Sequence, residues 1–298
     1  MIVLKKVNLK VLFQFSGGLM AYILALAILT WQLSLALHID NPTHLLPSMA
    51  VFGTILSLFL AFRTNEAYNR WWEARQLWGN LLNQSRNFAR QVLTLLPGDG
   101  SKEIEKRLVY RHIAYVNALR LHLRRQDHWQ EASKFMETQE WEAVETHANI
   151  PRQIIQLQAE SLKDIFNKDP GKDFRWIQMD TTLSEFYNIQ GGCERIKNTV
   201  FPRLYAFYTT AFSWLFASLL VLSLFDEFDW QTLIIRSIVA YVFITLDKLG
   251  QKLKNPFENY LSDTPMSSLC RTIEIELKQQ LGEKEVPAPL EPVDGVLY

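Results

Sequence analysis

The side chains that could perform covalent or metal chemistry are few, and none of them stands at a spacing that enzymes use. Cys193 and Cys270 form neither a metal-spaced pair nor a disulfide framework, and the six histidines contain no HxxxH or HExxH pair. Glycine-rich nucleotide motifs and the GxSxG nucleophile motif do not occur. Paired carboxylates such as Glu103 with Glu105 lie on polar helix faces, where solvation accounts for them. The sequence therefore predicts no catalytic residue, no metal site and no cofactor.

A charged side chain within an apolar run is more informative. Arg236 lies six residues after Trp230 in such a run, and an arginine at the centre of a bilayer costs at least ~2.5 kcal/mol. Arg236 either reaches towards the acidic residues at 226–229 or attracts anions at an outer mouth.

Composition places part of the chain in a membrane and part in water. Of its 298 residues, 48% are hydrophobic and 21% are charged, and the mean hydropathy is −0.04. Four spans of ~20 residues each would use only about a quarter of such a chain. The formal net charge is zero, which argues against a nucleic-acid partner because phosphate binding needs a basic surface.

One long helical pattern, residues 47–80, joins the two environments. Its apolar half carries small residues four apart, which would let another helix approach closely; these are Gly53, Ser57 and Ala61. A second face at the same spacing holds Thr54, Leu58 and Phe62. Past Arg63 the pattern becomes charged but keeps an apolar or small residue every three or four positions as far as Leu95, including Trp78, Leu81, Phe88 and Val92, which predicts one buried face. A basic and aromatic cluster marks the membrane–water interface; its members are Arg70, Trp71 and Trp72.

The remaining elements are expected to be helical as well. The apolar runs predict four spans near residues 17–37, 48–62, 204–225 and 230–246. Helical periodicity predicts further helices near 102–125, 128–147, 152–167, 173–197 and 265–281, and an extended or disordered tail at 283–298. We find no alternating strand pattern, so the fold class is an all-α membrane protein.

The distribution of basic residues predicts the topology. The short links 38–46 and 226–229 contain no Lys or Arg, whereas the termini and the long middle segment contain many, which places both termini on the cytoplasmic side. The expected divisions are 1–62 with spans 1 and 2, a cytoplasmic helical domain at 63–202, spans 3 and 4 at 203–246, and a cytoplasmic helix and tail at 247–298. The expected location is the bacterial inner membrane.

Three segments carry a resemblance to a known family. RTNEAYNRWWEARQLWGNL at 63–81, GGCERIKNT at 191–199 and KNPFENYLSDTPMSSLCRTIE at 254–274 together resemble the bacterial branch of the bestrophin family. The resemblance covers most of the chain, in order. One departure is Val200, where relatives often have proline, and it concerns local geometry only.

The resemblance implies a homopentameric ion channel whose second spans line a central pore. Apolar rings at i, i+4 and i+8 form the family's narrow neck, and counting back from Arg70 places them at Thr54, Leu58 and Phe62. Thr54 departs from the apolar character, so the gate would rest on the other two. A second constriction in the cytoplasmic vestibule falls at Ile177. Such rings gate by dewetting.

The helix wheel independently marks Ile177 as unusual. Trp176, Met179, Leu183 and Phe186 share one side of their helix, which is the expected core side. Ile177 lies on the opposite side, and the other residues of that side are polar: Thr181, Ser184 and Asn188. An exposed isoleucine is common on protein surfaces. Together with the resemblance, however, its position indicates that Ile177 forms the cytoplasmic aperture.

The sequence leaves the permeant ion and the regulation open. Animal bestrophins bind calcium through a dense acidic run, whereas the matching segment here has only Glu258 and Asp263, which are too few to predict a calcium site. The acidic link 226–229, Asp40 and the bacterial resemblance slightly favour cations such as Na⁺ or K⁺, while Arg236 favours anions. The function expected is therefore a passive channel for small monovalent ions, with chloride as the alternative.

Two other classes of protein stay open at this stage. A membrane-anchored signalling or scaffold protein would use the helical domain to bind a partner. A secondary transporter is disfavoured because the chain lacks an inverted repeat and glycine- or proline-broken spans. The partners expected for the channel are permeant ions, membrane lipid and further copies of the same chain.

Overall fold

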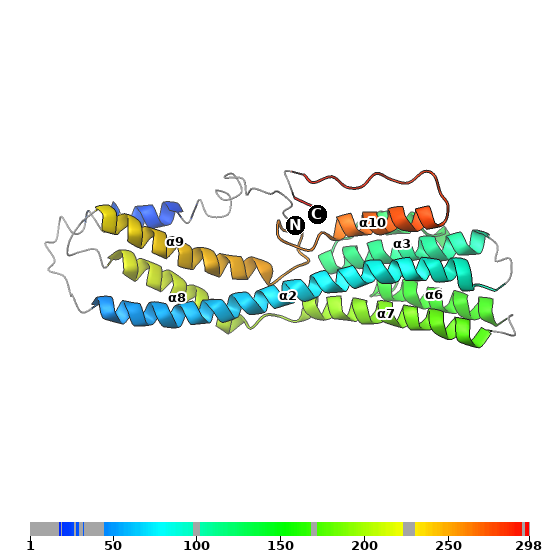
Figure 1. The fold of residues 1–298 in the computed structure, drawn as a ribbon, viewed down its shortest axis with the longest axis horizontal. Helices are drawn as coiled ribbons and strands as arrows, with labels where there is room; N and C mark the ends of the chain where they lie inside the picture. The colour runs from blue at the N-terminus through cyan, green and yellow to red at the C-terminus, as the bar shows by residue number, and fades with distance from the viewer. Residues whose placement is uncertain are drawn as a thin grey trace. The chain divides into compact units, whose positions relative to one another are not determined.

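The computed structural model describes residues 18, 20–26, 28–29, 32, 45–97, 102–167, 172–222, 230–293 and 296–297. Across these residues the chain is helical, apart from turns, extended segments and one isolated β-bridge between Val293 and Val296. The helices are α2 (Leu45–Leu95), α3 (Lys102–Arg124), α4 (Gln130–Ser133), α5 (Thr138–Glu145), α6 (Ile150–Phe166), α7 (Lys172–Asn198), α8 (Arg203–Leu222), α9 (Trp230–Leu253) and α10 (Met266–Gln280) (Figure 1). The all-α prediction is confirmed for this part of the chain.

The chain divides into two compact units, and α2 contributes to both. We call the first the helical bundle; it contains the described residues within 71–199 and 256–298. We call the second the apolar unit; it contains those within 4–70 and 200–255. The four-part division predicted from the sequence stays a prediction.

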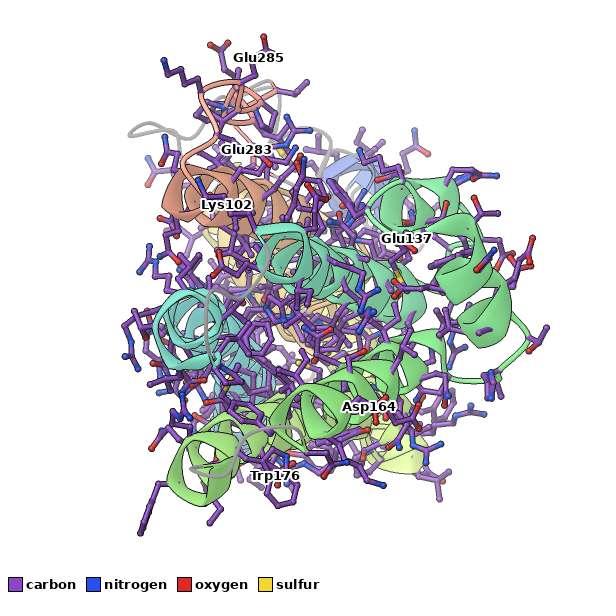
Figure 2. The ribbon with its side chains drawn as sticks, turned by 90° about the vertical axis from the view of Figure 1, so that its right-hand side faces the viewer. Lys102, Glu137, Asp164, Trp176, Glu283 and Glu285 are labelled. Atoms are coloured by element: carbon purple, nitrogen blue, oxygen red, sulfur yellow. The ribbon has the colours of Figure 1, made fainter. Side chains whose placement is uncertain are left out.

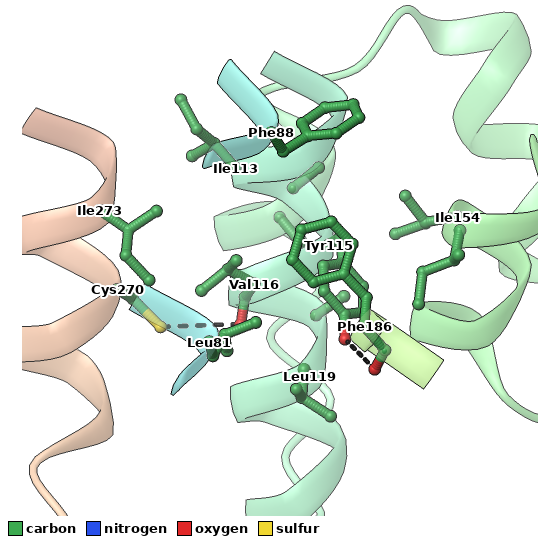
Figure 3. Packing of buried hydrophobic residues seen from close by; sticks show 14 of the residues in the cluster. Leu81, Phe88, Ile113, Tyr115, Val116, Leu119, Ile154, Phe186, Cys270 and Ile273 are labelled. Atoms are coloured by element: carbon green, nitrogen blue, oxygen red, sulfur yellow. Dashed lines mark hydrogen bonds between the residues drawn. The ribbon is translucent and has the colours of Figure 1, made fainter. Parts of the chain in front are cut away.

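The helical bundle is built around α3, which is buried along most of its length from Leu108 to Leu123. Helices α6, α7 and α10 pack against it. Polar contacts fix the packing: Tyr115 Oη donates to the carbonyl of Phe186 over 3.3 Å, and Cys270 Sγ lies 3.6 Å from the carbonyl of Val116 (Figure 3). The apolar face predicted for the second half of α2 is confirmed, since Trp78, Leu81, Phe88 and Val92 are fully buried.

Two expectations for the bundle were wrong. Residues 128–147 do not form one helix but two short ones, α4 and α5, separated by a turn. Trp176, expected in the core, has 38% of its surface exposed, whereas Met179, Leu183 and Phe186 are buried as predicted. Trp176 lies in the first turns of α7, at the edge of the bundle, where fewer helices surround it (Figure 2).

The start of α6 carries a side-chain cap and a proline. Asn149 Oδ1 accepts a hydrogen bond from the backbone N–H of Arg152 over 3.1 Å. Pro151 lies in the first turn, where its missing N–H costs nothing. Local chemistry therefore fixes where this helix begins.

In the apolar unit, α8 packs along α9. Two described segments are long and apolar enough to cross a membrane, Pro47–Leu95 and Arg203–Val221. The predicted first span and the acidic link 226–229 lie largely or wholly outside the described residues, and α9 occupies the predicted fourth span and extends past it. The number of spans stays a prediction.

A buried histidine connects α3 to α2 in the bundle. His112 Nε2 lies 2.8 Å from Ser85 Oγ, and Ser85 Oγ donates to the carbonyl of Leu81 over 2.7 Å. Because the hydroxyl proton is used there, Nε2 is the protonated nitrogen and donates to Ser85. Burial lowers the pKa of His112 to about 3, so the ring stays neutral in the folded protein.

We expect acid to destabilise the bundle through His112. The unfolded chain takes up a proton near pH 6.5 and the folded chain only near pH 3, so this histidine reduces stability progressively as the pH falls from 6.5. His112→Gln, which keeps an N–H donor, should show a flatter fall in melting temperature between pH 6.5 and about 5, where most carboxylates stay ionised. The same pH dependence in both proteins would contradict this assignment.

Candidate functional site

The predicted neck residues lie on one exposed face of α2 in the apolar unit. Leu58 and Phe62 have 56% and 59% of their surface exposed, and Thr54 is exposed as well. Thr54 Oγ1 donates to the carbonyl of Ala50 over 2.9 Å, which satisfies the hydroxyl within its own helix. The neighbouring positions Ile55 and Phe59 are also about half exposed. One chain alone therefore leaves the choice of the pore-facing side as a prediction.

The buried side of α2 differs in part from the predicted packing face. Leu56 and Leu60 are buried, and Gly53 faces the ring of Phe216, where an added Cβ would lie 3.0 Å from the ring. Ser57 and Ala61 are exposed in the single chain. A close-packing role for these two stays a prediction.

A buried ion pair follows the neck face directly. The Arg63 guanidinium pairs with the carboxylate of Asp247 on α9, and both side chains are almost fully buried, at 2% and 0% exposure. Gln251 Nε2 donates to Asp247 Oδ2 over 2.7 Å. Thr210 on α8 lies 3.3 Å from Arg63 Nη1 and 3.1 Å from Gln251 Nε2. The cluster therefore joins α2, α8 and α9 through charge-assisted hydrogen bonds.

Close backbone approach supports this cluster. Gly250, one helical turn beyond Asp247, faces Thr64, and a Cβ at this glycine would lie 3.3 Å from Thr64 Oγ1. On the α8 side, Tyr205 Oη donates to the carbonyl of Phe59 over 3.1 Å. These contacts fix the rotation of α2 about its axis, and so determine which side chains remain exposed.

The predicted aperture residue lies in the helical bundle, on the exposed side of α7. Ile177 has 56% of its surface exposed, and Phe174 one turn earlier has 88%. The polar residues predicted to share this side are Thr181, Ser184 and Asn188, and all three are exposed. The apolar character of this exposed side is therefore concentrated near the beginning of α7.

Helix α7 runs antiparallel to the second half of α2. Arg195 pairs with Glu73, Gly192 faces Leu77, where an added Cβ would meet a methyl group at 3.0 Å, and Arg175 Nη1 donates to the carbonyl of Leu95 over 3.4 Å. In each pair an early residue of α2 meets a late residue of α7. The exposed sides of the two helices are therefore neighbours within the bundle.

The predicted interface motif has a structural role as well. Trp71 Nε1 donates to the carbonyl of Ser262 over 2.7 Å and so ties α2 to the loop before α10. Arg70 is partly buried, and Trp72 is exposed beside the Trp71 ring, with 6.2 Å between ring centroids. Location at a membrane boundary stays a prediction for these residues.

The loop that matches the calcium-binding segment of animal bestrophins is organised by its own aspartate. Asp263 Oδ2 accepts the backbone N–H groups of Glu258 and Tyr260 over 2.7 and 3.0 Å. Burial raises the pKa of Asp263 despite these hydrogen bonds. Within the described ranges, no three His, Cys, Asp or Glu side chains are grouped to hold a metal ion.

Sequence reasoning did not pair Arg63 with Asp247. Arg63 was recognised only as the point at which the α2 pattern becomes charged, and Asp247, which directly follows the fourth predicted span, was not singled out. An opposite charge at the end of each of two predicted spans was the available signal. Arg236 is partly buried, and its predicted acidic partners lie outside the described residues.

Comparison with known proteins gives a consistent result. The family model described as "Bacterial/Fungal Bestrophin protein" matches residues 2–279. The voltage-dependent anion channel-forming protein YneE of Salmonella typhi is 30% identical over 287 residues, covering 94% of this chain and 93% of that protein. The voltage-dependent anion channel-forming protein mll4386 of Mesorhizobium japonicum is 34% identical over 242 residues, covering 79% of this chain and 76% of that protein.

Solved structures indicate the same family. The crystal structure of a bacterial bestrophin homologue from Klebsiella pneumoniae has a TM-score of 0.80 and 26% sequence identity, covering 92% of this chain and 100% of that one. The all-helical arrangement described above is thus that of a bacterial membrane protein.

We expect the loss of one member of the buried pair to cost more than the loss of both. Asp247→Leu leaves the Arg63 charge buried without its partner, which typically costs about 3–5 kcal/mol. Arg63→Met combined with Asp247→Leu removes both charges and should recover most of the loss. Melting temperatures of the detergent-solubilised protein measure both.

The exposed pair Arg86–Glu276 provides the matched control, because its charges are accessible to water and breaking it should cost less than about 1 kcal/mol. A double variant at Arg63 and Asp247 that melts no higher than Asp247→Leu would show that the two side chains do not act as a pair.

Proposed function

This chain belongs to the bacterial and fungal bestrophin family, and on that premise we propose that it forms a homopentameric channel passing small monovalent anions passively across a membrane. The family consists of channel-forming proteins, so the chain is a channel-type membrane protein and not an enzyme. We place the apolar unit in the bacterial inner membrane and the helical bundle, with both termini, in the cytoplasm, as the basic residues predict.

The exposed apolar face of α2 is the observation that carries the proposal. Leu58 and Phe62 each leave more than half of their surface uncovered, although the buried Arg63–Asp247 pair directly beside them fixes the helix. Large apolar side chains held in this way need lipid, another copy of the chain or a dewetting pore around them. Five copies around one axis would arrange Leu58 and Phe62 as two successive apolar rings.

The second constriction rests on Ile177. Its 56% exposure on an otherwise polar side of α7 suits a ring that narrows a water-filled vestibule. An apolar ring adds no fixed charge and selects by the cost of removing water from the ion. The neck rings and this aperture ring in series would set the conductance without trapping the ion.

The relatives favour anions over the cations that the sequence slightly favoured. Both relatives described above are named as anion channel-forming proteins. The cation preference rested on the resemblance to bacterial members, on Asp40 and on the acidic link 226–229. Asp40 and the link lie outside the described residues. We therefore propose chloride-like anions as the permeant species, and a cation channel of the same architecture is the alternative outcome.

We expect purified protein in liposomes to carry current with a reversal potential close to that of chloride. In asymmetric NaCl, an anion-selective pore and a cation-selective pore give reversal potentials of opposite sign. Cross-linking followed by mass determination should show five chains. A correctly assembled pentamer that carries no current at any voltage would contradict the channel proposal and would favour a scaffold role.

Widening either ring should increase the current. Leu58→Ala and Ile177→Ala each remove the branched end of a side chain, so we expect a several-fold larger single-channel conductance or a weaker ion selectivity. Ile55→Ala is the matched control, because Ile55 is 50% exposed on the adjacent side of the same helix. A larger current in Ile55→Ala, with Leu58→Ala and Ile177→Ala unchanged, would show that another side of α2 faces the pore.

A further inference from the structure

The second half of α2 carries a neutral polar face that none of the residues discussed so far explains. Its members are carboxamides spaced three or four apart, which is one side of a helix. They are Gln76, Asn80, Asn83 and Asn87, of which the first three are exposed and the last is partly buried. We call these four residues the amide face. Because α7 runs antiparallel beside α2, the exposed polar side of α7 described above adjoins it.

The amide face continues the helical phase of the predicted neck. Asn80 follows Phe62 by 18 residues along the single helix α2, which is five turns at 3.6 residues per turn. Asn83 and Asn87 extend the same line by one and two further turns. If Leu58 and Phe62 face the pore, the helix repeat brings these amides to the same side of α2.

Two arginines determine which end of the amides remains available. Arg90 Nη2 donates to Asn87 Oδ1 over 2.8 Å, and Arg86 Nη1 donates to Asn83 Oδ1 over 3.4 Å. A guanidinium group can only donate hydrogen bonds, so the amide atoms that face it must be the oxygens. This fixes the orientation of both amides and leaves their NH2 groups as donors. The NH2 of Asn87 also lies 3.5 Å from Gln84 Oε1, at the limit of a hydrogen bond.

Available donors on a neutral surface suit a mobile anion. An amide N–H can replace a water molecule around chloride, and without formal charge it does not hold the ion tightly. The two arginines beside the amide face differ in whether a carboxylate balances their charge. Arg86 forms two hydrogen bonds to Glu276, of 2.6 and 2.7 Å, whereas the contact of Arg90 described above is to an amide. The end of the face near Arg90 is therefore the more positive one.

We propose that the amide face lines the ion path on the bundle side of the neck, and that the NH2 groups of Asn83 and Asn87 make the channel favour anions. This inference rests on the proposed function, because it requires Leu58 and Phe62 to face the pore. It adds residues that determine selectivity in a stretch where the family resemblance assigned none.

Exchanging the donors for acceptors tests the selectivity. Asn83→Asp with Asn87→Asp keeps the side-chain size and still accepts from Arg86 and Arg90, so the helix should fold, but each chain loses two NH2 groups and gains two carboxylates. We expect the permeability ratio of chloride to sodium, from reversal potentials in asymmetric NaCl, to fall by about tenfold or more, equivalent to at least ~1.4 kcal/mol. Gln139→Glu is the control, because Gln139 is an exposed amide on α5.

Cysteine accessibility tests the position of the face. Both native cysteines are buried, and burial raises the pKa of Cys193 and raises that of Cys270 to about 12, so neither should react quickly. We expect a negatively charged methanethiosulfonate reagent to modify Asn80→Cys and to reduce the anion current at least several-fold. The same reagent should modify Gln139→Cys without effect on the current.

The outcomes separate this inference from the proposed function. An unreactive Asn80→Cys would place the amide face between copies of the chain, and a reactive one with unchanged current would place it on an outer surface; either result overturns the inference. A conducting wild type whose selectivity survives the Asn83→Asp and Asn87→Asp exchange overturns the inference alone. A wild type that carries no current overturns the proposed function, and this inference with it.

Discussion

The arrangement of the apolar unit depends on one buried ion pair, Arg63 with Asp247. Removing two charges from water is costly, and the cost is recovered only when the geometry supplies further hydrogen bonds. Gln251 and Thr210 supply them here. A pair under this constraint tolerates little rotation of its helices, because a turn of α2 would separate the charges inside an apolar environment. The exposure of Leu58 and Phe62 is therefore a consequence of where Arg63 must point. The ion pair contributes a fixed orientation more than it contributes net stability.

Along helix α2, positions related by the helical repeat carry two different kinds of side chain. In the apolar unit its exposed face carries Leu58 and Phe62, and in the bundle the positions in phase with them carry amides. Both surfaces are neutral, although the chain has 31 basic and 31 acidic residues. Of the charged residues close to this line, Arg63 pairs with Asp247 and Glu73 with Arg195, whereas Arg90 donates to the amide oxygen of Asn87. An unpaired charge in a narrow path would attract one ion strongly and slow its release, so a neutral line suits a passive channel.

Much of the fold could be predicted from the sequence because its helices are long and periodic. The buried face of α2 and the core positions Met179, Leu183 and Phe186 followed from spacing alone. The single helix predicted for 128–147 was wrong because a short amphipathic pattern does not reveal a turn within it. The core position predicted for Trp176 was wrong because periodicity identifies one side of a helix but does not show where the bundle ends along that helix. The Arg63–Asp247 pair was missed because it joins residues 184 positions apart, and spacing informs only about neighbours on one helix.

The orientation of the amides adds a physical reason for the preference for anions that the relatives' names suggest. A carboxamide is neutral and offers both a donor and an acceptor, so its presence alone does not distinguish chloride from sodium. The distinction comes from neighbours that occupy one end. A guanidinium one turn away occupies the oxygen and leaves the NH2 for the ion, whereas a carboxylate there would occupy the NH2 and leave the oxygen for a cation. At Asn83 and Asn87 the neighbours are Arg86 and Arg90. The sign of the permeant ion can therefore be encoded on a surface without net charge, by the hydrogen-bonding partners behind it.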